Sequence, residues 1–358
     1  MNIVFVLASL GSGGAERVVS LLANKMVELG LQVEIICLKF NDVYYQTDSR
    51  VKVTLAMQQT KNRLTELFWL RKYIKKQNPD VVIPFTEGVY CFTILSLLGT
   101  GIPDIASERL DPAAMSPTRK LLKRLLLPYA DWLVVQTQNI KEYFPKKIQA
   151  KTSVICNPVR EDVFSLPQPS LKGRSEEERL NRIISVGRLY PQKNQEMMIR
   201  AFATVADEFP DWQLVIYGEG PMRSSLELIV DSLQLRGRVL LPGRTEHVIE
   251  ELRKSKIFCM SSDYEGMSNA MMEAICVGLP IVTTNVSGVQ ELVEDDVNGF
   301  VVPCGDEVAM GAAFSKLLMD ESLRQAFSTN SSCKKELFNI ETVTEQWLSL
   351  ISLIIEKK

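Results

Sequence analysis

Short apolar runs alternate with longer amphipathic segments along the chain. The runs are rich in valine and isoleucine, and they lie at residues 2–8, 32–38, 80–85, 131–137, 152–158, 182–188, 212–218, 238–243, 256–262, 279–284 and 299–303. Continuous apolar strands that alternate with helices are typical of parallel sheets covered on both faces. The pattern therefore predicts an α/β protein built from two doubly wound halves.

Residues 165–181 break this alternation. They combine proline, glycine, serine and clustered charges with little apolar surface, which is typical of a linker. A chain of 358 residues is also too long for one ordinary core. We expect a first domain over 1–168 and a second over 175–340. Residues 341–358 form a predicted helix with one apolar face, which can dock on either domain, the first being the candidate.

The composition is that of a globular protein, with 46% hydrophobic and 23% charged residues. A net charge of -2 disfavours nucleic acid as a partner, because nucleic-acid-binding proteins usually carry a strong basic excess. The seven cysteines are scattered without a C-x-x-C pair, so we expect buried thiols in a reducing compartment. No apolar run has the length of a membrane span. These features predict a cytoplasmic protein that binds membranes at most peripherally.

A glycine-rich turn, L-G-S-G-G-A-E, follows the first apolar run. Gly11, Gly13 and Gly14 let the backbone approach a ligand closely, and the helix that follows presents free N–H groups. This arrangement suits a phosphate or a sugar hydroxyl. A dinucleotide fingerprint requires a third glycine at the position of Glu16, so a nicotinamide-dependent oxidoreductase is disfavoured. A tight turn without a ligand is the alternative.

The second half carries two cations just after its first apolar run. Arg188 and Lys193 follow Gly187 in the segment V-G-R-L-Y-P-Q-K-N. An arginine fork and a compact lysine charge at one strand end can clamp a diphosphate. Solvated loop charges are the alternative. The next strand ends in another glycine turn, G-E-G, which contains Glu219.

The segment D-Y-E-G-M-S-N-A-M-M-E-A places two carboxylates eight positions apart. Ligands of open α/β sheets bind beyond the carboxyl ends of the strands, which is where this turn falls. Glu265 lies in the turn, Gly266, Met267 and Ser268 can direct backbone N–H groups at an anion, and Glu273 lies one helical turn further on. Carboxylates suit pairs of sugar hydroxyls. The alternative makes Glu265 a partner of the helix dipole and Glu273 a surface residue.

With these segments the chain resembles glycosyltransferase family 4, the glycosyl transferases group 1. The resemblance is specific from Arg182 to about Leu323, through V-G-R-L-Y-P-Q-K-N, Y-G-E-G-P, L-P-G-R-T and the E-x7-E element, and looser in the first half. It implies the GT-B fold, in which two Rossmann-like domains face each other across a cleft. Among family members the chain looks most like bacterial enzymes that assemble lipid-linked surface polysaccharides or glycoprotein glycans.

The resemblance also implies roles for individual residues. Arg188 and Lys193 fall on the diphosphate-binding pair, Glu265 on the residue that contacts the donor sugar, and Glu273 on the residue that contacts the ribose. Arg188, Lys193 and Glu265 are therefore the catalytic candidates. The candidates for binding the donor are Gly13, Gly14, Gly218, Glu219, Gly243, Arg244, Gly266, Met267, Ser268 and Glu273.

One position departs from the family pattern. Many members carry a first-domain histidine that contacts the donor sugar, but the only histidine here is His247, in a predicted helix of the second half. The corresponding stretch is A-S-E-R-L-D-P, which places Arg109 at this position. Arg109 can bind a phosphate or a hydroxyl, or the contact is lost.

The resemblance implies transfer with retention of configuration, by attack of the acceptor on the face from which the diphosphate departs. Such a reaction needs no protein nucleophile and no cofactor. The chain also lacks the D-x-D motif that holds a divalent metal in the other main glycosyltransferase fold, so we expect metal-independent activity. The expected donor is a nucleotide diphosphate sugar, UDP-linked, that carries a hexose or an N-acetylhexosamine.

Two basic amphipathic stretches in the first half are candidates for the acceptor side. Residues 61–77 include Arg71, Lys75 and Lys76, and residues 118–130 include Arg119 and Lys123. Such helices can lie on an anionic membrane or bind a lipid diphosphate, whereas a solvated helix face is the alternative. Together they favour a polyprenyl-diphosphate-linked glycan as acceptor, held at the inner leaflet.

Two other functions are compatible with the sequence. A UDP-sugar 2-epimerase on the same fold also holds a nucleotide sugar, and it consumes the donor without an acceptor. A non-catalytic subunit that binds a sugar nucleotide is the second alternative, and the missing first-domain histidine is the feature that favours it.

Overall fold

The computed structural model describes residues 1–11, 13–39, 43–56, 62–110, 116–165 and 179–357. The chain divides into two compact units, which are described separately. Unit 1 comprises Met1–Pro158 with Phe338–Lys358, and unit 2 comprises Val159–Leu337. Most of the predicted linker, residues 166–178, lies outside the described residues, as does Lys61 of the first basic stretch.

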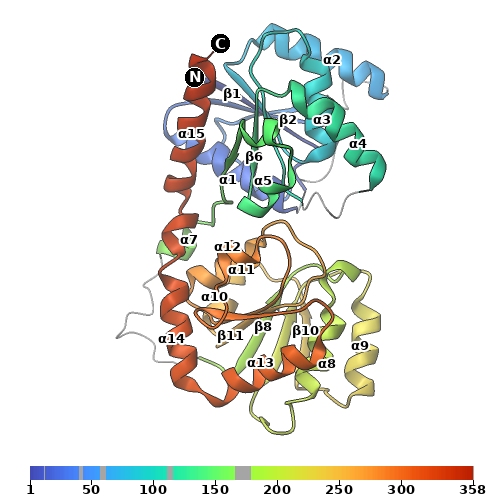
Figure 1. Ribbon diagram of the computed structural model, residues 1–358, viewed down its shortest axis with the longest axis vertical. Coiled ribbons are helices and arrows are strands. Elements are labelled where there is room, and N and C mark those ends of the chain that lie inside the picture. The colour runs from blue at the N-terminus through green and yellow to red at the C-terminus, as the bar shows by residue number, and fades with distance from the viewer. Residues whose placement is uncertain (12, 40–42, 57–61, 111–115, 166–178, 358) are drawn as a thin grey trace. The chain divides into compact units, whose positions relative to one another are not determined.

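The described residues of unit 1 form seven parallel strands, which helices cover (Figure 1). The strands are β1 (Asn2–Leu7), β2 (Gln32–Cys37), β3 (Lys52–Leu55), β4 (Val81–Pro84), β5 (Ile105–Ser107), β6 (Trp132–Val135) and β7 (Thr152–Val154). They form two sheets in the orders β3-β2-β1-β4 and β5-β6-β7. Isolated parallel bridges, Val82 to Asp104 and Phe85 to Ser107, join β4 to the second sheet.

The helices of unit 1 cover both faces of these strands. They are α1 (Gly14–Glu28), α2 (Arg63–Gln77), α3 (Glu87–Leu97), α4 (Pro117–Leu126), the 3-10 helix η3 (Leu127–Tyr129), α5 (Gln138–Tyr143), α6 (Lys146–Gln149) and α15 (Ile340–Glu356). The C-terminal helix α15 belongs to the core of this unit. Its Trp347 is fully buried and stacks on Phe85, with ring centroids 5.9 Å apart.

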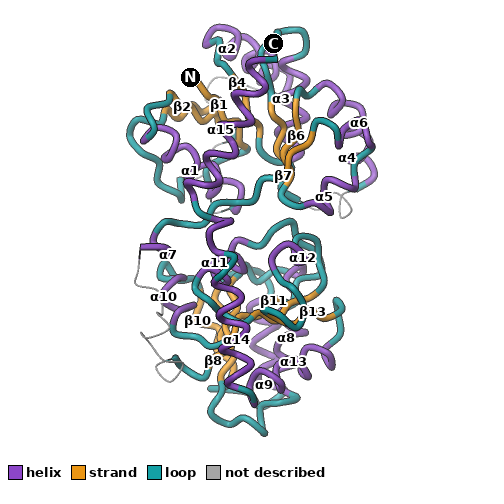
Figure 2. Tube along the Cα trace, turned by 60° about the vertical axis from the view of Figure 1, so that its left-hand side comes forward, coloured by secondary structure: helices purple, strands orange, loops and turns teal. Residues whose placement is uncertain are grey.

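In unit 2, the described residues form one parallel sheet of six strands in the order β10-β9-β8-β11-β12-β13. Figure 2 shows the strands of each unit enclosed between helices. The strands are β8 (Arg182–Val186), β9 (Gln213–Tyr217), β10 (Val239–Gly243), β11 (Ile257–Met260), β12 (Ile281–Thr284) and β13 (Gly299–Val302). The helices are α7 (Asp162–Ser165), η5 (Pro191–Lys193), α8 (Gln195–Ala203), α9 (Arg223–Ser232), α10 (Val248–Arg253), α11 (Asn269–Cys276), α12 (Val289–Leu292), α13 (Glu307–Met319), α14 (Glu321–Ser332) and η6 (Lys335–Phe338).

Each unit has one point where the order of strands along the chain reverses direction. In unit 1 the chain moves from β1 through β2 to β3, and then returns to the other side of β1 at β4. In unit 2 it moves from β8 to β10 and returns beside β8 at β11. The loops after the two strands at such a switch point diverge, and ligands of open α/β sheets bind between them. The loops at the two switch points follow β1 and β4 in unit 1, and β8 and β11 in unit 2.

The α/β fold with two doubly wound units confirms the prediction from the apolar runs. Two strands were missed, β3 and β5. The cysteine prediction was wrong in part, because Cys304 and Cys333 are exposed. Cys304 follows β13 beyond the edge of the sheet, and Cys333 follows α14, so neither is covered by an element packed above it.

Candidate functional site

The loops that follow β8, β9 and β10 pack backbone against backbone at the carboxyl edge of the unit 2 sheet. Gly187 N–H donates to Tyr217 O over 2.9 Å, and Gly218 N–H donates to Gly243 O over 2.8 Å. A Cβ atom on Gly218 would lie 1.8 Å from Gly187 O, and the φ of Gly218 is +152°. Only glycine allows this approach, so the sequence builds a surface of bare backbone at the strand ends.

The two loops at the unit 2 switch point are joined by an ion pair between Lys193 and Glu265. Lys193 Nζ donates to Glu265 Oε1, and Ser262 Oγ donates to the same oxygen over 3.0 Å. The side chains of Lys193 and Glu265 are 19% and 12% exposed. The structure thus brings together two of the three predicted catalytic residues, from loops 72 positions apart in the sequence.

Further hydrogen bonds fix the backbone on either side of this pair. Ser261 Oγ donates to Lys193 O over 2.9 Å, and the N–H of Asp263 donates to Gln192 O over 2.9 Å. Asn194 Nδ2 donates to Asp263 Oδ1 over 2.9 Å. Because both loops are held by their own polar groups, the cation and the carboxylate keep fixed positions without a ligand.

Arg188 lies at the same strand end with its side chain exposed. Its guanidinium lies 4.9 Å from the centroid of the Tyr190 ring, and its carbonyl accepts a hydrogen bond from Gln195 Nε2 over 2.9 Å. Within the described part of the chain no carboxylate forms an ion pair with Arg188. Its charge is therefore available to an anion that binds beside the Lys193–Glu265 pair.

Glu273 lies on α11 and is 3% exposed, so the alternative that made it a surface residue is wrong. Ser268 is the N-cap of this helix, and its side chain accepts from Met271 N–H over 3.3 Å. Met267 is buried and Gly266 is packed against Gly288, where a Cβ atom would lie 2.1 Å from Gly266 O. The turn between Glu265 and Glu273 is therefore closely packed.

Glu219 and Gly243 lie side by side after β9 and within β10. A Cβ atom on Gly243 would lie 2.9 Å from Glu219 Oε1. Hydrogen bonds from Arg223 lower the pKa of Glu219, and the charge of Arg244 acts in the same direction. Gly243 is buried beside Glu219, and Gly218 and Glu219 are half-buried, so these residues lie together at the ends of β9 and β10.

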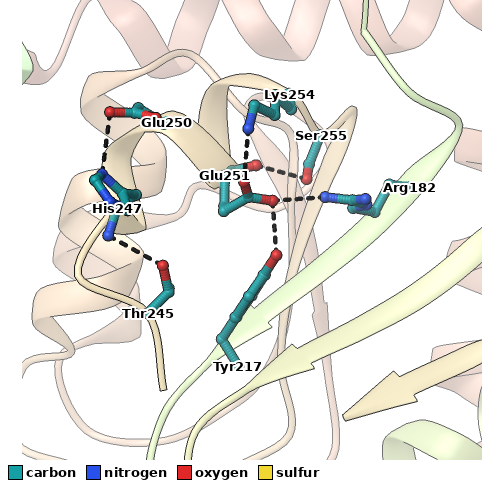
Figure 3. A network of polar contacts seen from close by, with 8 residues as sticks. All are labelled: Arg182, Tyr217, Thr245, His247, Glu250, Glu251, Lys254 and Ser255. Atoms are coloured by element: carbon teal, nitrogen blue, oxygen red, sulfur yellow. Dashed lines mark hydrogen bonds and ion pairs between the residues drawn. The ribbon is translucent and has the colours of Figure 1, made fainter. Parts of the chain in front are cut away.

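A polar network behind these loops was not anticipated from the sequence (Figure 3). The Glu251 carboxylate on α10 accepts hydrogen bonds from Tyr217 over 2.6 Å, Arg182 over 2.8 Å and Lys254 over 2.7 Å. Burial and the bond to Glu251 raise the pKa of Tyr217 to about 12. The network fixes the residue that precedes Gly218. His247 was expected inside a helix, but it lies immediately before α10 and is exposed.

In unit 1 the loop after β1 holds Gly13 as the N-cap of α1 and Gly14 as its first residue. The carboxylate of Glu16 folds back on this loop, and a Cβ atom on Gly13 would lie 2.1 Å from Glu16 Oε2. A negative charge at this place disfavours a phosphate. The glycine loop therefore suits a hydroxyl better than an anion.

Arg109 lies immediately beyond β5 and is buried, at 7% exposed. It donates from Nε to Ser107 Oγ and from Nη1 to Asn157 Oδ1, both over 2.7 Å, and its guanidinium stacks 4.5 Å from the centroid of the Phe85 ring. Burial lowers the pKa of Arg109 to about 9, so the side chain is still charged at neutral pH. These contacts link β5, the end of β7 and the aromatic core.

Two of the predicted acceptor-side cations point away from solvent, contrary to the expectation. Arg71 donates to Ser96 O over 2.9 Å and to Leu98 O over 2.7 Å, so it ties α2 to α3. Lys123 is 3% exposed and donates to Glu108 Oε2 over 3.1 Å. Both side chains were assigned to the acceptor or membrane side because of their charge, but each donates to an oxygen of the protein, where Arg71 is half-buried and Lys123 is buried. Lys75, Lys76 and Arg119 are exposed.

Two doubly wound units are the architecture of the GT-B fold, which similar solved structures share. The model of Glycosyltransferase Family 4 matches residues 12–163, and the model of Glycosyl transferases group 1 matches residues 169–332. The chain belongs to this glycosyltransferase family, which confirms the resemblance drawn from its motifs.

Two relatives in Campylobacter jejuni extend over nearly the whole chain. The first is a GalNAc-alpha-(1->4)-GalNAc-alpha-(1->3)-diNAcBac-PP-undecaprenol alpha-1,4-N-acetyl-D-galactosaminyltransferase, 29% identical, with 98% of each chain covered. The second is an N-acetylgalactosamine-N,N'-diacetylbacillosaminyl-diphospho-undecaprenol 4-alpha-N-acetylgalactosaminyltransferase, 26% identical, which covers 92% of this chain and 94% of its own.

Solved structures share the fold. HepE of Anabaena, in complex with UDP and glucose, matches with a TM-score of 0.83 and 19% identity over 98% of this chain and 99% of its own. The pneumococcal O-GlcNAc transferase GtfA, in complex with UDP and GlcNAc, matches with a TM-score of 0.82 and 15% identity over 99% of both chains.

Two further observations bear on metals and membranes. Among the described residues, no three His, Cys, Asp or Glu side chains are grouped closely enough to hold a metal ion. No helix in the described ranges has the length and apolar character needed to cross a bilayer.

Proposed function

We propose that this glycosyltransferase moves a hexose or an N-acetylhexosamine from a UDP-sugar to a polyprenyl-diphosphate-linked glycan, with retention of configuration. The reaction would serve the synthesis of a bacterial surface polysaccharide or glycoprotein glycan. The observation that carries the proposal is the Lys193–Glu265 pair at the unit 2 switch point, with the exposed Arg188 after the same strand as Lys193.

The pair exchanges partners when the donor binds. Without donor, the Glu265 carboxylate neutralises Lys193. The diphosphate of the donor competes for the lysine and for Arg188, because its oxygens carry more charge than one carboxylate. Glu265 is then released to accept a hydrogen bond from a hydroxyl of the donor sugar. The resting ion pair therefore keeps both groups oriented for the ligand.

The same cations act in the reaction. As the bond between the sugar and the diphosphate stretches, negative charge builds on the leaving oxygens, and Lys193 and Arg188 stabilise it. The leaving diphosphate accepts the proton of the attacking hydroxyl. The buried Glu273 holds the ribose, and the bare backbone of Gly218 and Gly243 receives the base.

The donor and acceptor classes follow from the relatives. Both Campylobacter jejuni enzymes are named as N-acetylgalactosaminyltransferases that act on glycans linked to undecaprenyl diphosphate. Their similarity extends over both units, so we propose the same classes for this chain, with UDP-GalNAc as the first donor to test. The sugar itself is decided by a few hydroxyl contacts in the pocket.

A transfer assay tests this function. The purified protein is incubated with radiolabelled UDP-GalNAc, UDP-GlcNAc or UDP-glucose and with an undecaprenyl-diphosphate-linked glycan that ends in GalNAc. We expect label in the lipid fraction, with an α linkage to the acceptor. Loss of donor without acceptor would instead support a 2-epimerase, and UDP binding without any turnover would support a non-catalytic subunit.

Metal independence is part of the proposal, since the chain has no D-x-D motif to hold a divalent ion under the diphosphate. The charge on the leaving group is met by Arg188 and Lys193 instead. We predict that an excess of EDTA leaves the rate of transfer unchanged. A loss of activity that Mg²⁺ restores would contradict this assignment.

The helix α4 supports association with an anionic membrane surface, because its leucines face outward. Leu121, Leu122 and Leu125 are 58%, 46% and 60% exposed, whereas Lys123 on the same helix is 3% exposed. Buried Glu108 anchors this lysine inside the unit. A helix held in this way presents apolar side chains to solvent, where a lipid surface can cover them.

The charges around this face favour anionic lipid over a neutral partner. The helices α2, α3 and α4 contain two carboxylates, Glu66 and Glu87, and both are buried. Their exposed charges are all cationic: Arg63, Lys72, Lys75, Lys76, Arg119 and Arg124. Each such cation near an anionic leaflet contributes about 1 kcal/mol of attraction. We therefore place the enzyme at the inner face of the cytoplasmic membrane.

Vesicle flotation tests the membrane face. We predict that the protein floats with vesicles of phosphatidylethanolamine and phosphatidylglycerol and not with phosphatidylcholine alone, and that Leu125→Glu abolishes flotation. Leu228→Glu is the matched control, because Leu228 is 69% exposed on a helix of unit 2. Equal flotation of the wild type with both vesicles would contradict an electrostatic membrane contact.

A further inference from the structure

Glu87 occupies in unit 1 the place that Glu265 occupies in unit 2. In unit 1, Glu87 follows β4, which lies beside β1 at the switch point. In unit 2, Glu265 follows β11, which lies beside β8 at the switch point. The loop on the other side of the unit 1 switch point holds Gly13 and Glu16. Because ligands of doubly wound sheets bind between these two loops, Glu87 lies at the expected binding edge of unit 1.

The side chain of Glu87 is largely buried, and among the described residues no group donates a hydrogen bond to its carboxylate. Its side chain is 5% exposed, and its one ion-pair partner among the described residues is Arg119, with Nε 3.9 Å from Glu87 Oε2. That arginine is itself 64% exposed, so water screens the pair. Neither Glu87 oxygen is among the fully buried side-chain atoms of the described residues that have no partner, so the carboxylate oxygens reach the accessible surface, where a ligand can donate to them.

Two other buried carboxylates of unit 1, Glu108 and Glu66, do accept hydrogen bonds from the protein. Glu108 accepts from Tyr90 over 2.8 Å and from Lys123 over 3.1 Å. Glu66 accepts from Arg63 over 2.7 Å. Burial raises the pKa of Glu87, the charges of Arg119 and Lys123 lower it, and Glu108 raises it further. The environment of Glu87 therefore lacks donors that its neighbours have.

The backbone before Glu87 is strained. Thr86 has φ 72° and ψ 150°, a conformation that β-branched residues rarely adopt, and its side chain makes no capping hydrogen bond to α3. The surrounding structure holds it there, since Thr86 N–H donates to Ser107 O over 3.0 Å. Strain of this kind is retained where it positions a functional group. Thr86 immediately precedes Glu87, the first residue of α3.

We propose that Glu87 is a binding residue for the acceptor, and that its carboxylate accepts a hydrogen bond from a hydroxyl group of the acceptor sugar. A hydroxyl supplies the missing donor, whereas a phosphate would meet the two carboxylates of Glu87 and Glu16. The assignment rests on the proposed function, in which a glycan is the acceptor. In this proposal the two units bind different chemical groups. The switch point of unit 1 binds a hydroxyl group, and the switch point of unit 2 binds a diphosphate.

The kinetics of Glu87→Gln with UDP-GalNAc and the undecaprenyl-diphosphate-linked glycan test this assignment. We expect kcat/KM for the acceptor to fall at least about tenfold, which is the effect of losing a hydrogen bond to a charged group. The KM for UDP-GalNAc and the slow hydrolysis of UDP-GalNAc without acceptor should stay within about twofold of the wild type. Glu66→Gln is the matched control, because Glu66 is a buried carboxylate of unit 1 with its own partner.

The outcomes separate the alternatives. An unchanged kcat/KM for the acceptor in Glu87→Gln would overturn the assignment. An equal loss of kcat/KM for the acceptor in Arg119→Gln would also overturn the assignment, because Glu87 would then act only as the partner of Arg119. A melting temperature of Glu87→Gln well below that of the wild type would also indicate a structural role. A wild type that transfers nothing to this acceptor, although it binds UDP, would overturn the proposed function and the assignment that rests on it.

Discussion

At the scale of single residues, the sequence predicts the roles of Lys193 and Glu265 separately. Their types and their motifs pointed to a phosphate ligand and a sugar ligand. That they form an ion pair with each other could not be predicted, because the contact depends on how the loops after β8 and β11 pack. Because the two residues form an ion pair, we propose that donor binding exchanges their partners and does not add two independent contacts.

Charge alone misled the prediction for two cations. Lys123 and Arg71 were assigned to a membrane face, but one pairs with buried Glu108 and the other caps the carbonyls at the end of α3. The periodicity of a basic, leucine-rich helix does not decide which face turns inward when buried acceptors are available. In α4 the lysine faces inward and the leucines face outward.

Glu87 gives a prediction for stability against pH. Its pKa is raised in the folded protein by burial and by Glu108, against the opposing charges of Arg119 and Lys123. The folded state then holds the proton more tightly than the unfolded state, so this residue costs stability as the pH rises above its ordinary pKa of 4.5. Glutamine does not titrate, so a glutamine at this position would not lower the stability as the pH rises.

We therefore predict that Glu87→Gln melts at a higher temperature than the wild type at pH 7, and that the difference shrinks toward pH 4. Thermal melts of both proteins at the two pH values provide the measurement. Glu66→Gln serves as the comparison for loss of a paired carboxylate. An increase in melting temperature of the same size at both pH values would show that the effect does not come from titration of Glu87.

At the scale of elements, continuous apolar runs located most of the strands, because parallel strands are buried on both faces. β3 and β5 were missed for different reasons. The residues of β3, Lys52–Leu55, lie at the sheet edge and are exposed or half-buried, so they lack an apolar run. The strand β5, Ile105–Ser107, has three residues, which is too short for any period to show.

The glycine at the end of β9 provides a prediction at this scale. Gly218→Ala would place a Cβ atom 1.8 Å from Gly187 O, so the loops after β8 and β9 would have to separate. We predict a free energy of unfolding lower by at least about 2 kcal/mol, together with loss of UDP binding. Urea unfolding and titration with UDP provide the measurements.

Gly237→Ala is the matched control for this variant. Gly237 also has a positive φ, +79°, but a Cβ atom there meets nothing within 4 Å. Gly237→Ala should lower the free energy of unfolding by about 1 kcal/mol, because of backbone strain alone, and should leave UDP binding unchanged. Equal losses in the two variants would show that the close approach of the loops is unimportant.

At the scale of the whole molecule, two doubly wound units were predictable because the rhythm of apolar runs repeats in both halves. The family followed from motifs concentrated in unit 2, and the matches to both halves bear it out. The acceptor side was less predictable. Its candidate residue Glu87 belongs to no recognised motif, and the signals that reveal it are burial without a donor and a strained threonine.

The central claim is that Lys193, with Arg188 and Glu265, forms the site where the donor diphosphate departs. The most direct test is the kcat of Lys193→Ala for sugar transfer from UDP-GalNAc to the lipid-linked glycan. Loss of one charge-stabilising group costs about 2.7 to 4 kcal/mol in comparable sites, so kcat should fall about 100- to 1,000-fold. Arg236→Ala, which removes an exposed cation of unit 2, should leave it unchanged. A near-native kcat for Lys193→Ala, with donor binding intact, would contradict the claim.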